Sequence, residues 1–143
     1  MKIWYGTPTL EQLHLAQDVG VVRHLAIAFV DIGDDYLRAR LTVADIHVQP
    51  YGILHGGVSV VLAETLGSTG AALTVDSSRF GVVGQEINAN HLRPAMPSAV
   101  ITGTARAFHI GTRSQVWSIE IRDERDRLIC ISRITMAVID RPT

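Results

Sequence analysis

Residues 55–75 read HGGVSVVLAETLGSTGAALTV, and this stretch decides the fold. From Gly56 to Leu73 nearly every side chain is small or apolar, whichever side of a helix it would occupy. A helix that is apolar all round belongs inside a structure rather than on its surface. The pattern therefore predicts one long helix, buried along most of its length, around which the chain is organised.

Glu64 is the one charged residue in this predicted helix. Burial penalises an ionised carboxylate, so it persists only with a partner, a raised pKa or a chemical role. Four residues share its face at helical spacing: Gly57, Val61, Ser68 and Ala71. These side chains are small and leave room for a ligand. A structural role also fits, in a salt bridge or against the same residue of a second subunit.

The helix is expected to begin at His55-Gly56-Gly57, where unpaired amides and the helix dipole favour a negatively charged atom. Before it, residues 44–54 form a predicted loop in which Pro50 and Gly52 mark turns. Loops held on a rigid support often carry functional groups. Gln49 and His55 are therefore candidate site residues.

The other segments predict short helices and strands. Residues 9–17 fit an amphipathic helix with a capping box, and a helical turn up to His24 follows. Residues 25–33 and 36–43 predict a β-hairpin. Four strand-like segments, 82–92, 99–110, 113–123 and 128–139, follow the helix, and their turn-rich separators favour hairpin or meander connections. The sum is an α+β fold, an antiparallel sheet wrapped around one helix that a second subunit helps to cover.

Composition narrows the class of protein. The chain has 143 residues, enough for one domain over residues 1–143, and its net charge of −1 gives no sign of nucleic-acid binding. The single Cys130 excludes a disulfide framework and a thiolate zinc cluster, so we expect no metal. The first residues lack a secretory lead, which favours the cytoplasm. Glu64, hydroxyls and glycines argue against a membrane span.

The run QPYGILHGG at 49–57, followed by LAETLGS at 62–68, resembles the hotdog-fold acyl-CoA thioesterases. The likeness is to the subgroup typified by 4-hydroxybenzoyl-CoA thioesterase of the phenylacetate-pathway type, with its enterobactin- and menaquinone-linked bacterial relatives. VGQEINANH at 83–91, HIG at 109–111 and Val116-Trp117 extend it over nearly the whole chain.

This resemblance implies a hotdog fold, a dimer whose sheets join into one, and a tetramer. It implies hydrolysis of acyl-CoA thioesters, aryl or medium-chain, without metal or cofactor. Glu64 matches the catalytic carboxylate and Gly56 the oxyanion-binding amide. Gln49 and His55 match groups that orient or polarise the thioester, and Ser68 matches a hydroxyl that places water.

The candidate substrate-binding residues are His91, Arg93, Thr65, Gly84 and Arg113. His91 falls near the acyl pocket or the CoA arm, and the two arginines could meet CoA phosphates. His91, Arg93 and Arg113 also fit solvated strand ends. His47 and His109 are expected to be structural, Trp117 to be core, and the charged residues 123–127 to be a solvated hairpin tip.

Thioester hydrolysis fits these residues chemically. It develops an oxyanion, which amides at a helix start stabilise, and it needs a base or a nucleophile, which Glu64 can supply. The sequence leaves open which of the two roles Glu64 has. Two other functions are weighed. In a hotdog hydratase or dehydratase we would expect a His-rich segment with a Pro-Gly run before the helix, where this chain has HGG. A non-catalytic acyl-CoA-binding module would not need Gln49, His55, Glu64 and Ser68 together.

Overall fold

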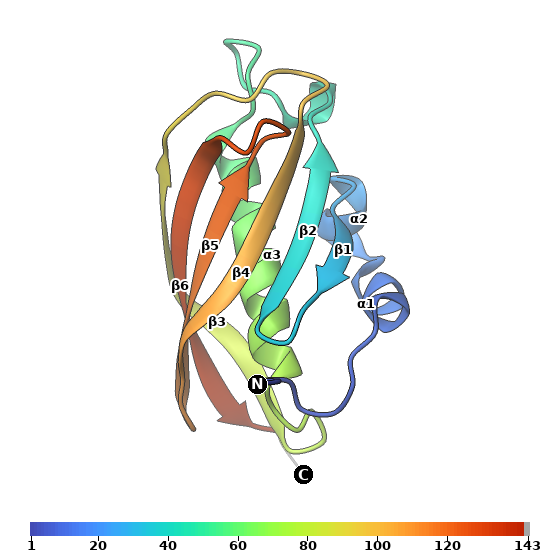
Figure 1. Cartoon of the computed structure of the whole chain (residues 1–143), viewed down its shortest axis with the longest axis vertical. Coiled ribbons are helices and arrows are strands. Elements are labelled where there is room, and N and C mark those ends of the chain that lie inside the picture. Colours follow the sequence, from blue (N-terminus) through green and yellow to red (C-terminus); the bar gives the residue numbers. More distant parts are fainter. Residues whose placement is uncertain (142–143) are drawn as a thin grey trace.

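The computed structural model describes residues 1–141 and contains a six-stranded antiparallel sheet curved around one long helix (Figure 1). The helix is α3 (Gly56–Leu73). The strands are β1 (Ala28–Ile32), β2 (Tyr36–Thr42), β3 (Phe80–His91), β4 (Val100–Ile110), β5 (Ser114–Arg122) and β6 (Leu128–Asp140). The short helices α1 (Leu10–Gln17) and α2 (Gly20–His24) and the 3-10 turn η1 (Asp45–His47) complete the fold. The predicted α+β architecture is confirmed.

The strand order differs from a simple meander. The sheet runs β1-β2-β4-β5-β6-β3, so β3 lies at an edge beside β6, and β4 lies beside β2. The hairpin expected between β3 and β4 is therefore wrong, whereas those joining β1 to β2, β4 to β5 and β5 to β6 are right. Turn residues at 93–97 mark the end of a strand but do not specify which strand it pairs with. Between β3 and β4 the chain therefore crosses from the β3 edge of the sheet to the side of β2.

The core lies between α3 and the concave face of the sheet. Close approach of helix and sheet depends on two glycines in α3. A Cβ atom at Gly67 would lie 2.5 Å from Ile134 Cγ2, and one at Gly70 would lie 2.8 Å from Trp117 Cζ3. Larger residues would push the helix off the sheet. The largest fully buried apolar side chains are Leu37, Leu41, Leu62, Leu66, Ile101, Trp117, Ile119, Ile121, Ile134 and Met136.

One face of α3 is not covered by its own chain. Gly57, Glu64 and Ala72 are exposed there, and Ser68 is half-buried. The predicted burial of α3 is confirmed for the side that meets the sheet, but Glu64 is exposed in the single chain. Ala71 is fully buried and does not belong to this open face. The open face is what the second subunit predicted from the sequence would cover.

The N-terminal elements follow their sequence signals. Thr9 and Gln12 form the predicted capping box: the Gln12 N–H donates to Thr9 Oγ1 at 3.2 Å and the Thr9 N–H to Gln12 Oε1 at 3.1 Å. In β2, Leu37, Ala39 and Leu41 are buried, whereas their neighbours on the other face are more exposed. The predicted alternation is confirmed.

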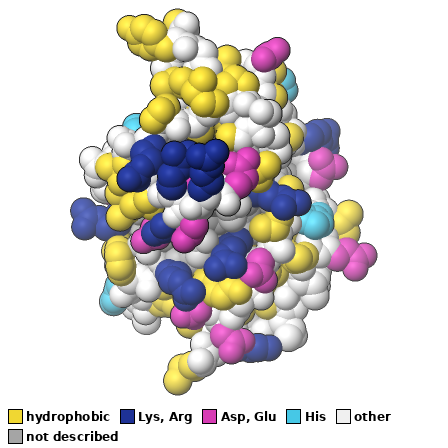
Figure 2. Space-filling view, turned by 45° about the horizontal axis from the view of Figure 1, so that its top comes forward, with side chains coloured by type: hydrophobic (Ala, Val, Ile, Leu, Met, Phe, Trp, Pro, Cys, Tyr) yellow, Lys and Arg dark blue, Asp and Glu magenta, His cyan; other side chains and the backbone are white. Residues whose placement is uncertain are grey.

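Charges of both signs lie on the surface, as Figure 2 shows for one side of the molecule. Several arginines on the outer face of the sheet pair with carboxylates; Arg106 Nη1 lies 2.7 Å from Asp35 Oδ1, and Arg122 Nη2 lies 2.8 Å from Glu120 Oε2. Such exposed pairs contribute little stability each. The face is therefore mixed in charge rather than uniformly basic.

The β5–β6 turn is more ordered than a solvated tip. The side chain of Asp123 is only 5% exposed, and it accepts hydrogen bonds from the Arg125 N–H, the Arg127 N–H and Arg127 Nε. The expectation of a solvated tip is therefore wrong for Asp123 and right for Asp126, whose side chain is 88% exposed. Alternation of charges predicts a turn but not which carboxylate folds back onto the backbone.

Candidate active site

The start of α3 is capped by His55. Its Nδ1 accepts the Gly57 N–H at 2.8 Å, which satisfies one of the unpaired amides of the first turn. Since Nδ1 accepts, a neutral His55 carries its proton on Nε2, which remains available as a donor. The Gly56 N–H, one residue before Gly57, donates to no group among residues 1–141. An unpaired amide at a helix start is suited to an oxyanion.

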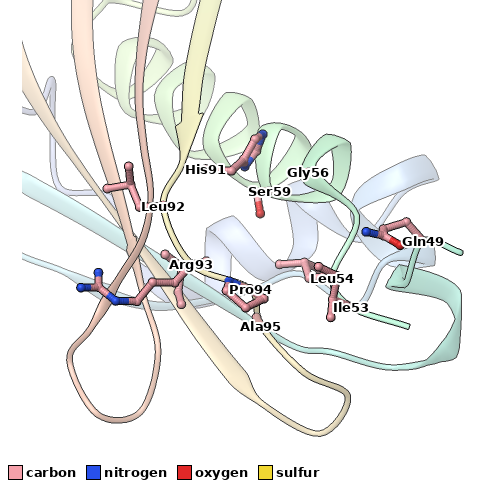
Figure 3. A pocket seen from close by; sticks show the side chains of 11 residues that line it. Gln49, Ile53, Leu54, Gly56, Ser59, His91, Leu92, Arg93, Pro94 and Ala95 are labelled. Atoms are coloured by element: carbon pink, nitrogen blue, oxygen red, sulfur yellow. The ribbon is translucent and has the colours of Figure 1, made fainter. Parts of the chain in front are cut away.

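The loop before α3 holds Gln49 beside this helix start. Gln49 N–H donates to the Ile53 carbonyl at 2.9 Å, and Val48 forms a bridge with Leu54, so the loop is a tight turn rather than an open strand. The Tyr51 N–H donates to Gln49 Oε1. That bond fixes which way the amide faces and leaves its NH2 group free to donate. Figure 3 shows the Gln49 nitrogen turned toward the cavity.

A cavity of about 410 Å³ opens beside the helix start (Figure 3). His91, at the end of β3, packs directly on Gly56: a Cβ atom at position 56 would lie 2.7 Å from His91 Nε2. Only glycine allows this approach of ring and backbone. The residues lining the cavity are Gln49, Ile53, Leu54, Gly56, Ser59, His91, Leu92, Arg93, Pro94, Ala95 and Ile129.

Arg93 lines the mouth of this cavity, but its guanidinium points away from the helix start in Figure 3. Arg93 Nη1 donates to the Leu128 carbonyl at 2.8 Å and is exposed. This position suits an anionic group outside the cavity better than the reacting carbonyl inside it. Ser59, which the sequence analysis did not single out, lines the cavity and is only 1% exposed. Its sole sequence signal is a hydroxyl one turn after HGG.

Glu64 lies two turns further along α3, against another part of β3. A Cβ atom at Gly84 would lie 2.8 Å from Glu64 Oε1, so the carboxylate rests on a glycine of β3. The β3–β6 register shifts between Gly84 and Glu86, which marks a β-bulge at Gln85. Bulges re-aim side chains and recur beside active sites. Thr65, next to Glu64 in sequence, is half-buried.

Ser68 continues the face of Glu64 by one turn. Its hydroxyl lies 3.8 Å from Met136 Sδ, a weak acceptor, so it is available to a stronger partner. Arg113 lies just before β5, at the end of the sheet opposite the cavity, where Arg113 Nη1 pairs with Asp140 Oδ2 at 3.0 Å rather than with another candidate residue. The structure therefore does not bring Arg113 to the other candidate residues.

The single chain holds two separate clusters. The first contains Gln49, His55, Gly56 and His91; the second contains Glu64, Thr65, Ser68 and Gly84. Eight residues of helix separate Gly56 from Glu64, which at ~1.5 Å per residue is about 12 Å. One thioester carbonyl cannot reach both. Among residues 1–141 no group of three His, Cys, Asp or Glu could hold a metal ion, and no helix is long and apolar enough to cross a membrane.

The chain is similar to known proteins over almost its whole length. The model of the thioesterase superfamily matches residues 51–130. The chain is 47% identical over 96% of its length to 1,4-dihydroxy-2-naphthoyl-CoA hydrolase of Escherichia coli, covering 99% of that protein. It is 42% identical to the proofreading thioesterase EntH of Cronobacter sakazakii, covering 96% of this chain and 98% of that protein.

A solved structure gives the same result for the fold. A mutant of the thioesterase PA1618 from Pseudomonas aeruginosa superposes with a TM-score of 0.94 at 43% identity, covering 98% of this chain and all of that one. The similarity therefore extends over both clusters, including the loop before α3 that carries Gln49.

Proposed function

Because the chain belongs to the thioesterase superfamily and is a hydrolase of acyl-CoA thioesters, we propose that its two clusters combine into one active site across a dimer. The observation that carries this proposal is the ~12 Å of helix between Gly56 and Glu64. Gly56 and Gln49 of one subunit would bind the thioester oxygen. Glu64 of the other subunit would act on the carbonyl carbon.

The chemistry assigns a role to each cluster. When water or the Glu64 carboxylate adds to the carbonyl carbon, the carbonyl oxygen becomes negatively charged. Among residues 1–141 neither the Gly56 N–H nor the Gln49 NH2 group has another acceptor, so both would be available to this oxygen. The C–S bond then breaks, and the CoA thiolate leaves and takes up a proton. Where Glu64 is the nucleophile, water then hydrolyses the anhydride that forms on Glu64 and releases the free acid. If Glu64 acts as a base, it removes a proton from the attacking water, which the Ser68 hydroxyl would help to place.

Contacts with β3 suggest how the subunits pair. Glu64 rests on Gly84 and Gly56 rests on His91, both on the edge strand β3. Antiparallel pairing of β3 with its copy would bring Glu64 to the partner's Gly56 if Gly84 lies opposite the partner's His91. Because Gln85 is the extra residue of the bulge, this register places the two-fold axis at Asn88.

A cysteine cross-link tests this register. Asn88→Cys should form a disulfide between subunits on mild oxidation, since opposed residues of antiparallel strands lie ~4.5–5.5 Å apart at Cα, within disulfide range. Asn90→Cys is the matched control on the same strand, because the register keeps its two copies far apart. The buried Cys130, whose pKa burial raises, should not react. Cross-linking of Asn90→Cys but not Asn88→Cys would refute the register.

The substrate is proposed to be an aryl- or medium-chain acyl-CoA. The relatives include a hydrolase named for 1,4-dihydroxy-2-naphthoyl-CoA, an aryl thioester. His91 lines the cavity beside Gly56, and Arg93 stands at its mouth, where it could meet a CoA phosphate. A tetramer built from two dimers and a cytoplasmic location, both expected from the sequence, belong to the same proposal.

Thiol release from a panel of acyl-CoA esters tests the function directly. Benzoyl-CoA and medium-chain acyl-CoA should be hydrolysed, with kcat/KM values that rank the acyl groups. Hydration of an enoyl-CoA without thiol release would favour the hydratase. Binding of acyl-CoA with neither reaction would favour a non-catalytic module.

A further inference from the structure

His47 is buried, with 2% of its surface exposed, and the candidate active site assigns it no role. It ends the turn η1, two residues before Gln49. Its Nδ1 accepts the Ala44 N–H at 2.8 Å, and its Nε2 lies 2.9 Å from the Leu25 carbonyl. An N–H on one side and a carbonyl on the other admit one neutral tautomer, with the proton on Nε2.

These bonds join the loop before α3 to a fixed part of the core. Leu25 is the buried C-cap residue that follows α2, and a carbonyl at a helix end lacks a partner within its own helix. The His47 Nε2–H supplies that partner. The ring therefore connects the end of α2 to the loop that carries Gln49.

The backbone of His47 holds the other end of the same loop. The His55 N–H donates to the His47 carbonyl at 2.8 Å. Between these two residues, Val48 pairs with Leu54 and the Gln49 N–H bonds to the Ile53 carbonyl. The turn that presents Gln49 and the cap of α3 thus begin and end on His47.

We propose that His47 is a positioning residue for thioester hydrolysis, which places the Gln49 amide beside the Gly56 N–H through its bond to Leu25. The inference rests on the proposed role of Gln49 in binding the oxyanion. His47 itself touches no reacting atom. Its effect is on the geometry of a donor, so it alters turnover more than substrate binding.

Two substitutions separate the two bonds of the ring. His47→Gln keeps a donor at the position of Nε2, whereas His47→Asn keeps an acceptor at the position of Nδ1 but is too short to reach Leu25. We expect His47→Asn to lower kcat about tenfold with KM changed less than about twofold, and His47→Gln to restore most of kcat. Combined with Gln49→Ala, His47→Asn should cause no further loss, because both act through one donor.

His14 supplies a matched control. Its Nε2 lies 2.7 Å from the Phe29 carbonyl, so it also bonds to a backbone carbonyl, but it is exposed and belongs to α1, which lies away from the loop before α3 in Figure 1. His14→Asn should lower the melting temperature without lowering kcat. A folded, dimeric His47→Asn enzyme with normal kcat, or with a kcat loss equal to that of His14→Asn, would overturn the inference.

The wild-type protein provides a measurement that does not depend on variant folding. A long-range proton–nitrogen NMR spectrum at neutral pH should show His47 with Nε2 protonated and Nδ1 bare. The opposite tautomer, or a freely exchanging ring, would overturn the inference.

If Gln49→Ala hydrolyses normally, the proposed role of Gln49 fails and the inference with it. If Gln49→Ala is inactive and His47→Asn is normal, only the inference fails.

Discussion

The start of α3 and its middle carry the two halves of the candidate site, and they differ in how far one chain completes them. At the start, Gln49, His55 and His91 are held by backbone bonds or close packing around Gly56. In the middle, Glu64 is exposed, and its carboxylate lies against Gly84 of its own chain, with no hydrogen bond or ion pair to it among residues 1–141. One half is preorganised before any partner arrives, and the other is not.

This difference separates the two tasks of catalysis. Donors that stabilise an oxyanion are effective when they are fixed in advance, and the bonds around Gln49 and Gly56 fix them. A carboxylate that attacks the carbonyl or activates one water molecule must instead be shielded from bulk solvent at the moment of reaction. The second subunit would provide that shielding. Substitutions in the two halves should therefore have different consequences.

The largest effect is expected in the middle of the helix. Glu64→Gln should leave the fold intact, because the side chain is exposed and keeps its size, and should lower kcat at least ~100-fold through loss of the base or nucleophile. Thiol release under saturating substrate measures this, with circular dichroism as the folding control. Near-normal hydrolysis would remove Glu64 from the mechanism.

A smaller effect is expected from the strand that supports Glu64. In Gly84→Ala the new Cβ would lie 2.8 Å from Glu64 Oε1 and displace the carboxylate, so kcat should fall about tenfold, since small misplacements of catalytic groups are costly. The flexible end of Glu64 can move, so the fold should survive.

Gly81→Ala is the control for this substitution. It lies on the same strand, and its new Cβ would lie 3.6 Å from Ile139, an ordinary contact. Its kcat should stay within about twofold of wild type, as expected away from the catalytic groups. Equal losses in the two alanine variants would show that β3 as a whole, rather than the support of Glu64, determines the rate.

The smallest effect on turnover is expected at Asp123, which lies in the β5–β6 turn near Pro94 and Ala95 and outside both halves of the candidate site. Burial alone would raise the pKa of Asp123, but hydrogen bonds from Arg127 and from the Arg125 amide outweigh it, and its pKa lies below the ordinary value. A lowered pKa stabilises the folded state above the unfolded pKa, and this stabilisation disappears as pH falls through the folded pKa. Asp123→Asn should therefore lower the melting temperature by a few degrees at pH 7 and leave kcat unchanged.

The pH dependence of the difference in melting temperature between the wild-type protein and Asp123→Asn is a more specific measurement. The gap in melting temperature between wild type and Asp123→Asn should shrink as pH falls below about 4, the ordinary pKa of the carboxyl, and close as pH falls through the lower pKa of the folded state. A gap that stays constant with pH would show that shape rather than charge holds the turn.

Much of the fold could be predicted because its signals are local. The all-apolar character of residues 56–73 identifies α3, the Thr9 capping box identifies α1, and alternation identifies β2. The position of β3 was not predictable, because pairing with β6 rather than β4 depends on contacts far apart in sequence. Local sequence patterns therefore predict the type and order of the helices and strands better than they predict which strands pair.

The candidate site divides in the same way. Gly56 and Glu64 stand out in sequence because a double glycine and a lone charge interrupt an apolar run. Ser59 and His47 do not stand out in the sequence. The position of Ser59 in the cavity and the bond of His47 to the Leu25 carbonyl both depend on residues that are far away along the chain. The exposure of Glu64 in the single chain was not predicted for a related reason. An apolar sequence shows that a helix must be buried, but not whether its own chain or a second subunit buries each face.

Mixed dimers test the central claim, that each site takes its oxyanion donors from one subunit and its carboxylate from the other. Inactive Glu64→Ala and inactive Gln49→Ala chains are denatured together, refolded and assayed. Random pairing makes half of the dimers mixed, each with one intact site of two, so activity should recover to roughly one quarter of wild type. If mixed dimers form and the sample stays as inactive as its parents, Gln49 and Glu64 act within one chain and the account is wrong.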